Sequence, residues 1–115
     1  MRSDKERGVR SKAFFNPGEF VMEYEANLLD EQELKLAEAE YEDEGEKIYV
    51  VETPKGYFDA TYRVNSIGRY INHAAKGPNL LLRQPIEARG RWRIGFVAKT
   101  SISPGDELFW DYGFR

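Results

Sequence analysis

The chain has 115 residues, no cysteine and a single histidine, His73. Without cysteine it cannot form disulfides, zinc–thiolate sites or a thiol nucleophile. One histidine leaves little for a metal site, so we predict none. No stretch approaches the roughly 18 consecutive apolar residues of a membrane-spanning helix. The charged first residues are not followed by an apolar run, so we expect a soluble, unsecreted protein.

Apolar residues make up 41% of the chain and aromatic residues 14%, which is enough for one modest core. We therefore expect a single domain over residues 1–115. The formal net charge of -3 argues against broad binding of nucleic-acid phosphates. It is better suited to a basic protein partner.

Two similar turns precede apolar segments. Pro17-Gly18 comes before residues 20–24, and Pro104-Gly105 comes before residues 107–112. Proline sets the backbone angle of a tight turn and glycine supplies its left-handed position, so both pairs predict turns that lead into strands. Other β-favouring segments are residues 48–51, 57–58 and 92–98, the first two on either side of the turn Pro54-Lys55-Gly56.

Residues 30–41 predict one helix. Asp30 and, three residues later, Glu33 resemble a capped helix start, and apolar residues follow at helical spacing. We interpret the acidic residues 40–46 as a solvated loop where the helix ends, and the alternative is a dock for basic substrate residues. The pattern as a whole predicts a mainly β domain made of short strands.

Two segments resemble motifs of the SET domain family of protein lysine methyltransferases. They are Arg69-Tyr70-Ile71-Asn72-His73 and Glu107-Leu108-Phe109-Trp110-Asp111-Tyr112-Gly113. Further matches are Arg7-Gly8-Val9, residues 17–24, and Asp59-Ala60-Thr61 placed ahead of residues 65–69. Each motif alone is weak, but five in the family's order are a strong signal. Within the family, the chain looks most similar to the enzymes that add a single methyl group to histone H4 at its twentieth position.

The resemblance implies a SET fold of several small sheets with one short inserted helix. It also implies a C-terminal pseudoknot, in which the final strand and residues 69–73 form a knot-like crossing. The implied activity is transfer of one methyl group from S-adenosylmethionine to a lysine in a histone tail or another basic peptide. The implied location is the nucleus, with the cytoplasm as the alternative. The nucleosome is a candidate partner, whereas neither a membrane nor sequence-specific nucleic acid is expected. Whether flanking segments belong to a longer chain stays open.

The resemblance also assigns cofactor-binding residues. Arg7, Gly8, Asn72, His73 and Tyr112 match positions that contact S-adenosylmethionine. The arginine is a candidate partner for a carboxylate, glycine permits close backbone approach, and the asparagine amide has donors and an acceptor for polar edges. The alternatives are a surface role for Arg7 and a structural hydrogen bond for His73.

Tyr112 matches the family's tyrosine beside the methyl-transfer channel and is predicted to be catalytic, with Tyr49 and Tyr24 as further candidates. The alternative for each tyrosine is core packing with a satisfied hydroxyl. Trp110, Tyr49 and Phe109 are predicted to line the substrate channel. Trp110 stands where the family generally has tyrosine or phenylalanine, and its larger ring favours the addition of one methyl group only.

Other interpretations remain. One alternative is a catalytically silent SET-like module that binds basic peptides without methylating them. Three features favour it: Ala74 stands in place of the family's usual serine, Trp110 is larger than the usual residue, and the match ends at Arg115. A nucleic-acid-binding strand is a further alternative, formed by Arg83, Arg89, Arg91 and Arg93 with Trp92 among them, although alternating arginines more often form a solvated surface. A hydrolase built from Ser66 and His73 is discounted, because no Gly-x-Ser-x-Gly turn is present.

Overall fold

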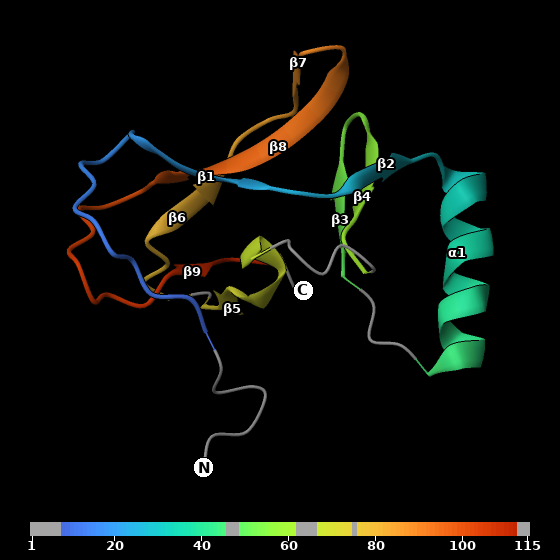
Figure 1. The fold of residues 1–115 in the computed structure, drawn as a ribbon, viewed down its shortest axis with the longest axis horizontal. Coiled ribbons are helices and arrows are strands. Elements are labelled where there is room, and N and C mark those ends of the chain that lie inside the picture. Colours follow the sequence, from blue (N-terminus) through green and yellow to red (C-terminus); the bar gives the residue numbers. More distant parts are fainter. Residues whose placement is uncertain (1–7, 46–48, 62–66, 75, 113–115) are drawn as a thin grey trace.

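The computed structural model describes residues 8–45, 49–61, 67–74 and 76–112. These residues form three small β-sheets, one α-helix and one short 3-10 helix, η2 (Ile67–Tyr70) (Figure 1). The predicted mainly β fold with one helix is therefore confirmed. No helix in the described part of the chain is long and apolar enough to cross a membrane.

The largest sheet is built around one long central strand. Its strands are β1 (Phe20–Tyr24), β8 (Arg91–Ala98), β6 (Leu80–Leu82) and β7 (Ile86–Ala88). β1 and β6 flank β8, and β7 pairs with the first residues of β8, always in antiparallel register. Because side chains alternate along a strand, Ile94, Phe96 and Ala98 point into the core while Arg93 and Gly95 face the other side.

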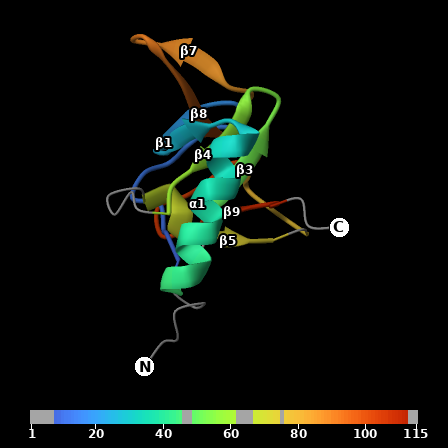
Figure 2. The same cartoon turned by 90° about the vertical axis from the view of Figure 1, so that its right-hand side faces the viewer.

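The second sheet supports the helix. It consists of β2 (Asn27–Leu29), β4 (Gly56–Asp59) and β3 (Val50–Thr53), with β4 in the middle. The predicted turn Pro54-Lys55-Gly56 joins β3 to β4. The helix α1 (Glu31–Glu44) lies along this sheet, as the two perpendicular views show (Figures 1 and 2).

The start of α1 agrees with the prediction and its end does not. Asp30 caps the helix by accepting a hydrogen bond from the Glu33 backbone N–H, and the Glu33 carboxylate accepts one from the Asp30 N–H. The acidic loop expected from residue 40 onward is wrong as far as Glu44, because these residues continue the helix. The helix stops at Gly45, whose φ of 73° is the left-handed conformation that ends many helices.

The third sheet is a parallel pair formed by β5 (Asn72–His73) and β9 (Phe109–Trp110). The loop that follows β5 contacts β9 along both of its edges. Ala74 N–H donates to the Trp110 carbonyl on one edge, while Asn79 exchanges two hydrogen bonds with Phe109 on the other. β9 therefore lies between β5 and Asn79, as expected of the predicted crossing between the final strand and residues 69–73.

One apolar core joins the sheets to the crossing. Its largest fully buried side chains are Phe58, Ile71, Leu80, Phe96 and Ile102, each less than 2% exposed. Ile71 directly precedes β5, and Phe96 belongs to β8. The crossing is thus anchored against the largest sheet.

Candidate active site

The three tyrosines predicted to be catalytic come from distant segments and meet in one region. Tyr24 ends β1, Tyr49 precedes β3, and Tyr112 follows β9. Burial raises the pKa of the Tyr24 hydroxyl, and the neighbouring Tyr112 raises it further. Burial also raises the pKa of Tyr112, with Tyr49 as the second cause. Ring contacts also link Tyr24 to Tyr112 through Phe96 and Trp110.

Tyr112 is held on the crossing at two points. Its hydroxyl donates a short hydrogen bond to the carbonyl of Ile71. Its backbone N–H donates to Nδ1 of His73 over 2.9 Å. The ring lies 4.9 Å from the Trp110 ring and 5.0 Å from the His73 ring, measured between centroids. Tyr112 is still 38% exposed, so a substrate can approach it.

Tyr49 is held by its backbone and by a cation. Its N–H donates to Oγ1 of Thr61 over 3.1 Å, and its carbonyl accepts from the Ala60 N–H over 2.8 Å. The Arg69 guanidinium lies 5.1 Å from the centre of the Tyr49 ring. The same guanidinium donates to the carbonyls of Ala60 and Thr61. Arg69 therefore joins the segment that carries Tyr49 to η2.

Trp110 belongs to the core, as does Tyr24, and joins it to Tyr112. It is 9% exposed, and its ring is 5.2 Å from Phe96, which in turn is 6.0 Å from Tyr24. Phe109, the other predicted channel residue on β9, is not brought into this cluster. Adjacent residues of a strand point to opposite faces, so its side chain leaves β9 on the side away from Trp110.

Two of the predicted cofactor residues, Gly8 and Asn72, meet at Glu107. Asn72 donates a 2.9 Å hydrogen bond from its amide to Oε2 of Glu107. Gly8 lies against both residues, since a side-chain carbon at Gly8 would come within 3.1 Å of the Asn72 amide nitrogen and 2.9 Å of the Glu107 carboxyl carbon. His73 follows in β5, while Arg7 lies outside the described residues. The structure thus brings Gly8 and Asn72 together, whereas the His73 ring contacts Tyr112 in the tyrosine cluster.

Sequence reasoning assigned no role to Glu107 or Arg69, although both lie inside the motifs that carry the resemblance. A motif shows that a position matters without showing what its side chain contacts. Glu107 bonds Asn72 across the crossing, and Arg69 contacts Tyr49. Both contacts span residues far apart in the chain, so only the fold reveals them.

A single added methyl group at Gly8 tests the cofactor side of the site. We expect Gly8→Ala to push Glu107 away from Asn72 and to weaken S-adenosylmethionine binding about tenfold, the effect of losing roughly one hydrogen bond. Isothermal titration calorimetry measures this affinity. Gly105→Ala, in an exposed turn, is the comparison variant, since it strains the backbone without approaching the site. Equal affinities in Gly8→Ala and the unsubstituted chain would exclude Gly8 from the cofactor site.

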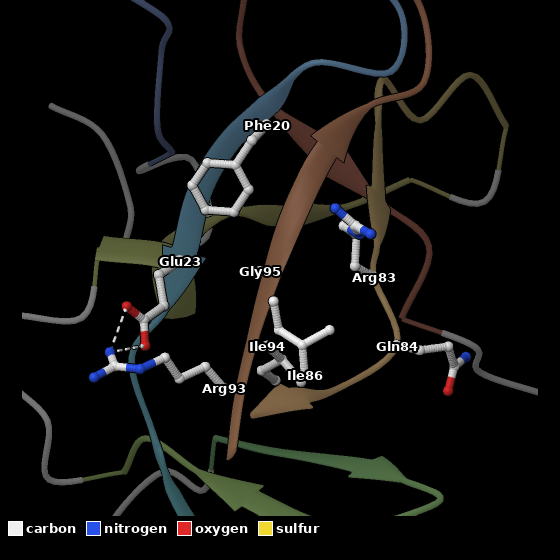
Figure 3. A pocket seen from close by; sticks show the side chains of 8 residues that line it. All are labelled: Phe20, Glu23, Arg83, Gln84, Ile86, Arg93, Ile94 and Gly95. Carbon is white, nitrogen blue, oxygen red and sulfur yellow. Dashed lines mark hydrogen bonds and ion pairs between the residues drawn. The ribbon is translucent and has the colours of Figure 1, made fainter. Parts of the chain in front are cut away.

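A shallow pocket of about 430 Å³, counted with its open mouth, lies away from this cluster (Figure 3). It occupies the face of the β1–β8–β6 sheet opposite the core, between Phe20 and Arg83. Arg93 forms one wall, where its guanidinium pairs with the Glu23 carboxylate at 3.2 Å and its Nε donates to the carbonyl of Ala88. The Arg93 cation is thus already paired, which argues against the alternative of a nucleic-acid-binding strand.

Within residues 8–45, 49–61, 67–74 and 76–112, no group of three or more histidine, cysteine, aspartate or glutamate side chains could hold a metal ion. The polar groups at the site are phenol hydroxyls, backbone carbonyls, the Asn72 amide, the His73 imidazole and the Glu107 carboxylate.

A family model described as SET domain matches residues 6–113. Among curated proteins, the Caenorhabditis elegans histone-lysine N-methyltransferase set-1 is 37% identical over 116 residues, covering 96% of this chain and 48% of that protein. The Drosophila pseudoobscura histone-lysine N-methyltransferase Set8 is 33% identical, covering 96% of this chain and 16% of that protein. The chain therefore spans about half the length of the first relative and much less of the second.

Solved structures show the same likeness. CpSET8 from Cryptosporidium has a TM-score of 0.74 at 30% identity, covering 89% of this chain and 50% of that one. The ctPRC2 complex bound to S-adenosylmethionine has a TM-score of 0.68 at 30% identity, covering 92% of this chain and 13% of that one. Likeness in sequence and in fold thus extends over nearly the whole chain.

Proposed function

Because this chain belongs to the SET domain family, we propose that it transfers a methyl group from S-adenosylmethionine to a lysine side chain of a histone tail. The observation that carries this proposal is the meeting of Tyr24, Tyr49 and Tyr112 beside the crossing of β5 and β9. The relatives include Set8 proteins, in keeping with the resemblance to the monomethylating subfamily.

The tyrosine cluster suits an amine substrate. A lysine with a pKa of ~10.4 is neutral in only roughly one molecule in a thousand at neutral pH, and only the neutral amine can attack a methyl group. Aromatic walls remove water from the ammonium and so favour its loss of a proton. The Tyr112 hydroxyl donates to the Ile71 carbonyl, and a phenol oxygen that donates can also accept. It can therefore accept an N–H of the amine and orient the nitrogen lone pair.

The cofactor side fits the polar part of S-adenosylmethionine. When bound, this cofactor supplies a methyl group on a positively charged sulfur. We propose that Gly8 allows close backbone approach and that Asn72 and His73 bind its polar edges. The Glu107 carboxylate holds the Asn72 amide in position. Aromatic faces such as those of Trp110 and Tyr112 favour a nearby cation.

The proposed substrate is supported by the charge of α1. This helix carries seven exposed carboxylates against one lysine, Lys35. It stands beside the sheet formed by β2, β4 and β3, with Tyr49 directly before β3 (Figure 2). We propose that this negative surface attracts a basic peptide toward the molecule. We propose histone tails, free or in nucleosomes, as substrates and the nucleus as the location.

Mass spectrometry of core histones and nucleosomes incubated with the chain and S-adenosylmethionine tests the activity. We expect a methyl gain on one lysine that is absent with the Tyr112→Phe variant. A rise in melting temperature with S-adenosylmethionine, but no methyl gain on any histone, would instead favour the silent peptide-binding module, because a ligand of the folded state stabilises it whether or not it reacts.

Trp110 is proposed to limit the product to one methyl group. Its indole fills the space between Phe96 and Tyr112. Trp110→Tyr removes part of that volume, so we expect dimethyl-lysine to appear beside monomethyl-lysine in the mass spectrum. Trp92→Tyr is the matched control, since Trp92 lies on β8 under the Lys55 ammonium. Identical product distributions in all three proteins would show that Trp110 does not set the limit.

A further inference from the structure

The acidic helix α1 is attached to the rest of the molecule by few side chains. Leu34 and Tyr41 are its buried residues, at 8% and 6% exposure, and Ala37 is partly buried. The other helix residues are exposed. The position of α1 therefore depends strongly on what Leu34 and Tyr41 contact.

Tyr41 contacts a buried carboxylate. Its hydroxyl donates a 2.5 Å hydrogen bond to Oδ2 of Asp59, which is 5% exposed. The other oxygen, Oδ1, accepts a 2.9 Å hydrogen bond from the backbone N–H of Thr61. A buried carboxylate is costly unless it is hydrogen-bonded, so both donors help to keep Asp59 and Thr61 in this arrangement.

The segment Asp59-Ala60-Thr61 is also the segment that holds Tyr49. Ala60 N–H donates to the Tyr49 carbonyl, and Thr61 Oγ1 accepts from the Tyr49 N–H. The Thr61 carbonyl in addition accepts a 2.6 Å hydrogen bond from the Arg69 guanidinium, which lies over the Tyr49 ring. A hydrogen-bonded path thus runs from α1 through Asp59 to both sides of Tyr49.

We propose that Tyr41 is a positioning residue: by its hydrogen bond to Asp59, and through Thr61, it fixes the backbone of Tyr49. The inference rests on the proposed function, because that function places Tyr49 in the lysine channel. No methyl-transfer chemistry occurs at Tyr41 itself.

Amide hydrogen exchange, followed by NMR, tests the link without any need for activity. Tyr41→Phe keeps the ring and removes the hydroxyl. We expect the Tyr49 and Ala60 amides to exchange about tenfold faster, as for loss of roughly one hydrogen bond, while the Ala98 amide in the largest sheet keeps its rate. Leu34→Ala loosens the same helix without touching Asp59, and we expect the rates at Tyr49 and Ala60 to rise no more than at Ala98.

Steady-state kinetics test the consequence. For Tyr41→Phe we expect kcat to fall about tenfold, with the KM for a histone peptide and the affinity for S-adenosylmethionine within about twofold of the unsubstituted chain. For Leu34→Ala we expect kcat to stay within about twofold of the unsubstituted chain. This control distinguishes loss of the Tyr41 hydroxyl from a general loosening of α1.

The outcomes separate the two proposals. The positioning role would be overturned if the Tyr49 and Ala60 amides of Tyr41→Phe exchanged at unchanged rates. It would also be overturned if the exchange rates of all measured amides rose equally. An unchanged kcat in an active protein would overturn it as well. Absence of methyl transfer by the unsubstituted chain on any histone would overturn the proposed function alone, and the exchange rates would still decide whether Tyr41 fixes Tyr49.

Discussion

Tyr112→Phe is expected to lower the rate of methyl transfer at least about 100-fold, the usual effect of removing one group positioned for the transition state. The hydroxyl bonds the Ile71 carbonyl and lies at the meeting point of the tyrosines, where it can orient the lysine amine. The ring remains in the variant, so its packing on Trp110 and His73 is kept. Single-turnover kinetics with a histone peptide give the rate.

Two controls show whether the loss of rate comes from the Tyr112 hydroxyl itself. Tyr57→Phe, on β4 and outside the cluster, is expected to keep the full rate. S-adenosylmethionine affinity, from calorimetry, is expected to be the same in both variants. A Tyr112→Phe protein that keeps full activity would remove the Tyr112 hydroxyl from the mechanism.

The pH dependence follows from the direction of the Tyr112 pKa. Burial raises it above the usual value of ~10, so the hydroxyl stays protonated through neutral and mildly alkaline pH. Any increase in rate between about pH 7 and pH 9 then comes from deprotonation of the substrate lysine, whose ordinary pKa is ~10.4. We expect the Tyr112→Phe variant to keep the same upward slope at a lower rate.

Phe96→Ala is expected to lower the free energy of unfolding by about 3–5 kcal/mol, a large part of the total for a domain of this size. Phe96 is 0% exposed and its ring contacts both Tyr24 and Trp110. Its removal leaves a cavity under the active site as well as in the core. Urea denaturation followed by circular dichroism measures the change.

Phe14→Ala is the matched control, because the Phe14 side chain is 54% exposed. We expect it to change the free energy of unfolding by less than about 0.5 kcal/mol. Similar losses in the two variants would mean that Phe96 does not anchor the core.

Local features of the fold could be predicted from the sequence because their causes lie within a few residues. Asp30 and Glu33 predicted the capping box, and Pro17-Gly18 and Pro104-Gly105 predicted turns that the structure contains. Gly18 and Gly105 have φ of 88° and 93°, the conformation for which glycine is suited. The knot-like crossing came from the family resemblance, not from local pattern.

The features that could not be predicted from the sequence depend on contacts between distant residues. Residues 42–44 are acidic and read as a loop, yet the helix continues through them to the glycine cap at Gly45 and is anchored nearby by Tyr41 on Asp59. The short strands β2, β6 and β7 have three residues each, too few for a periodic signal. The roles of the site residues remain predictions that the experiments above test.

The position of β9 between β5 and Asn79 has a consequence for folding. It requires contacts between remote parts of the chain, as does the Arg10 hydrogen bond to Gly105 across 95 residues. Such topologies fold slowly, since much chain entropy is lost before the contacts form. We therefore expect the site that contains Tyr112 and His73 to form only when β9 has reached its place beside β5.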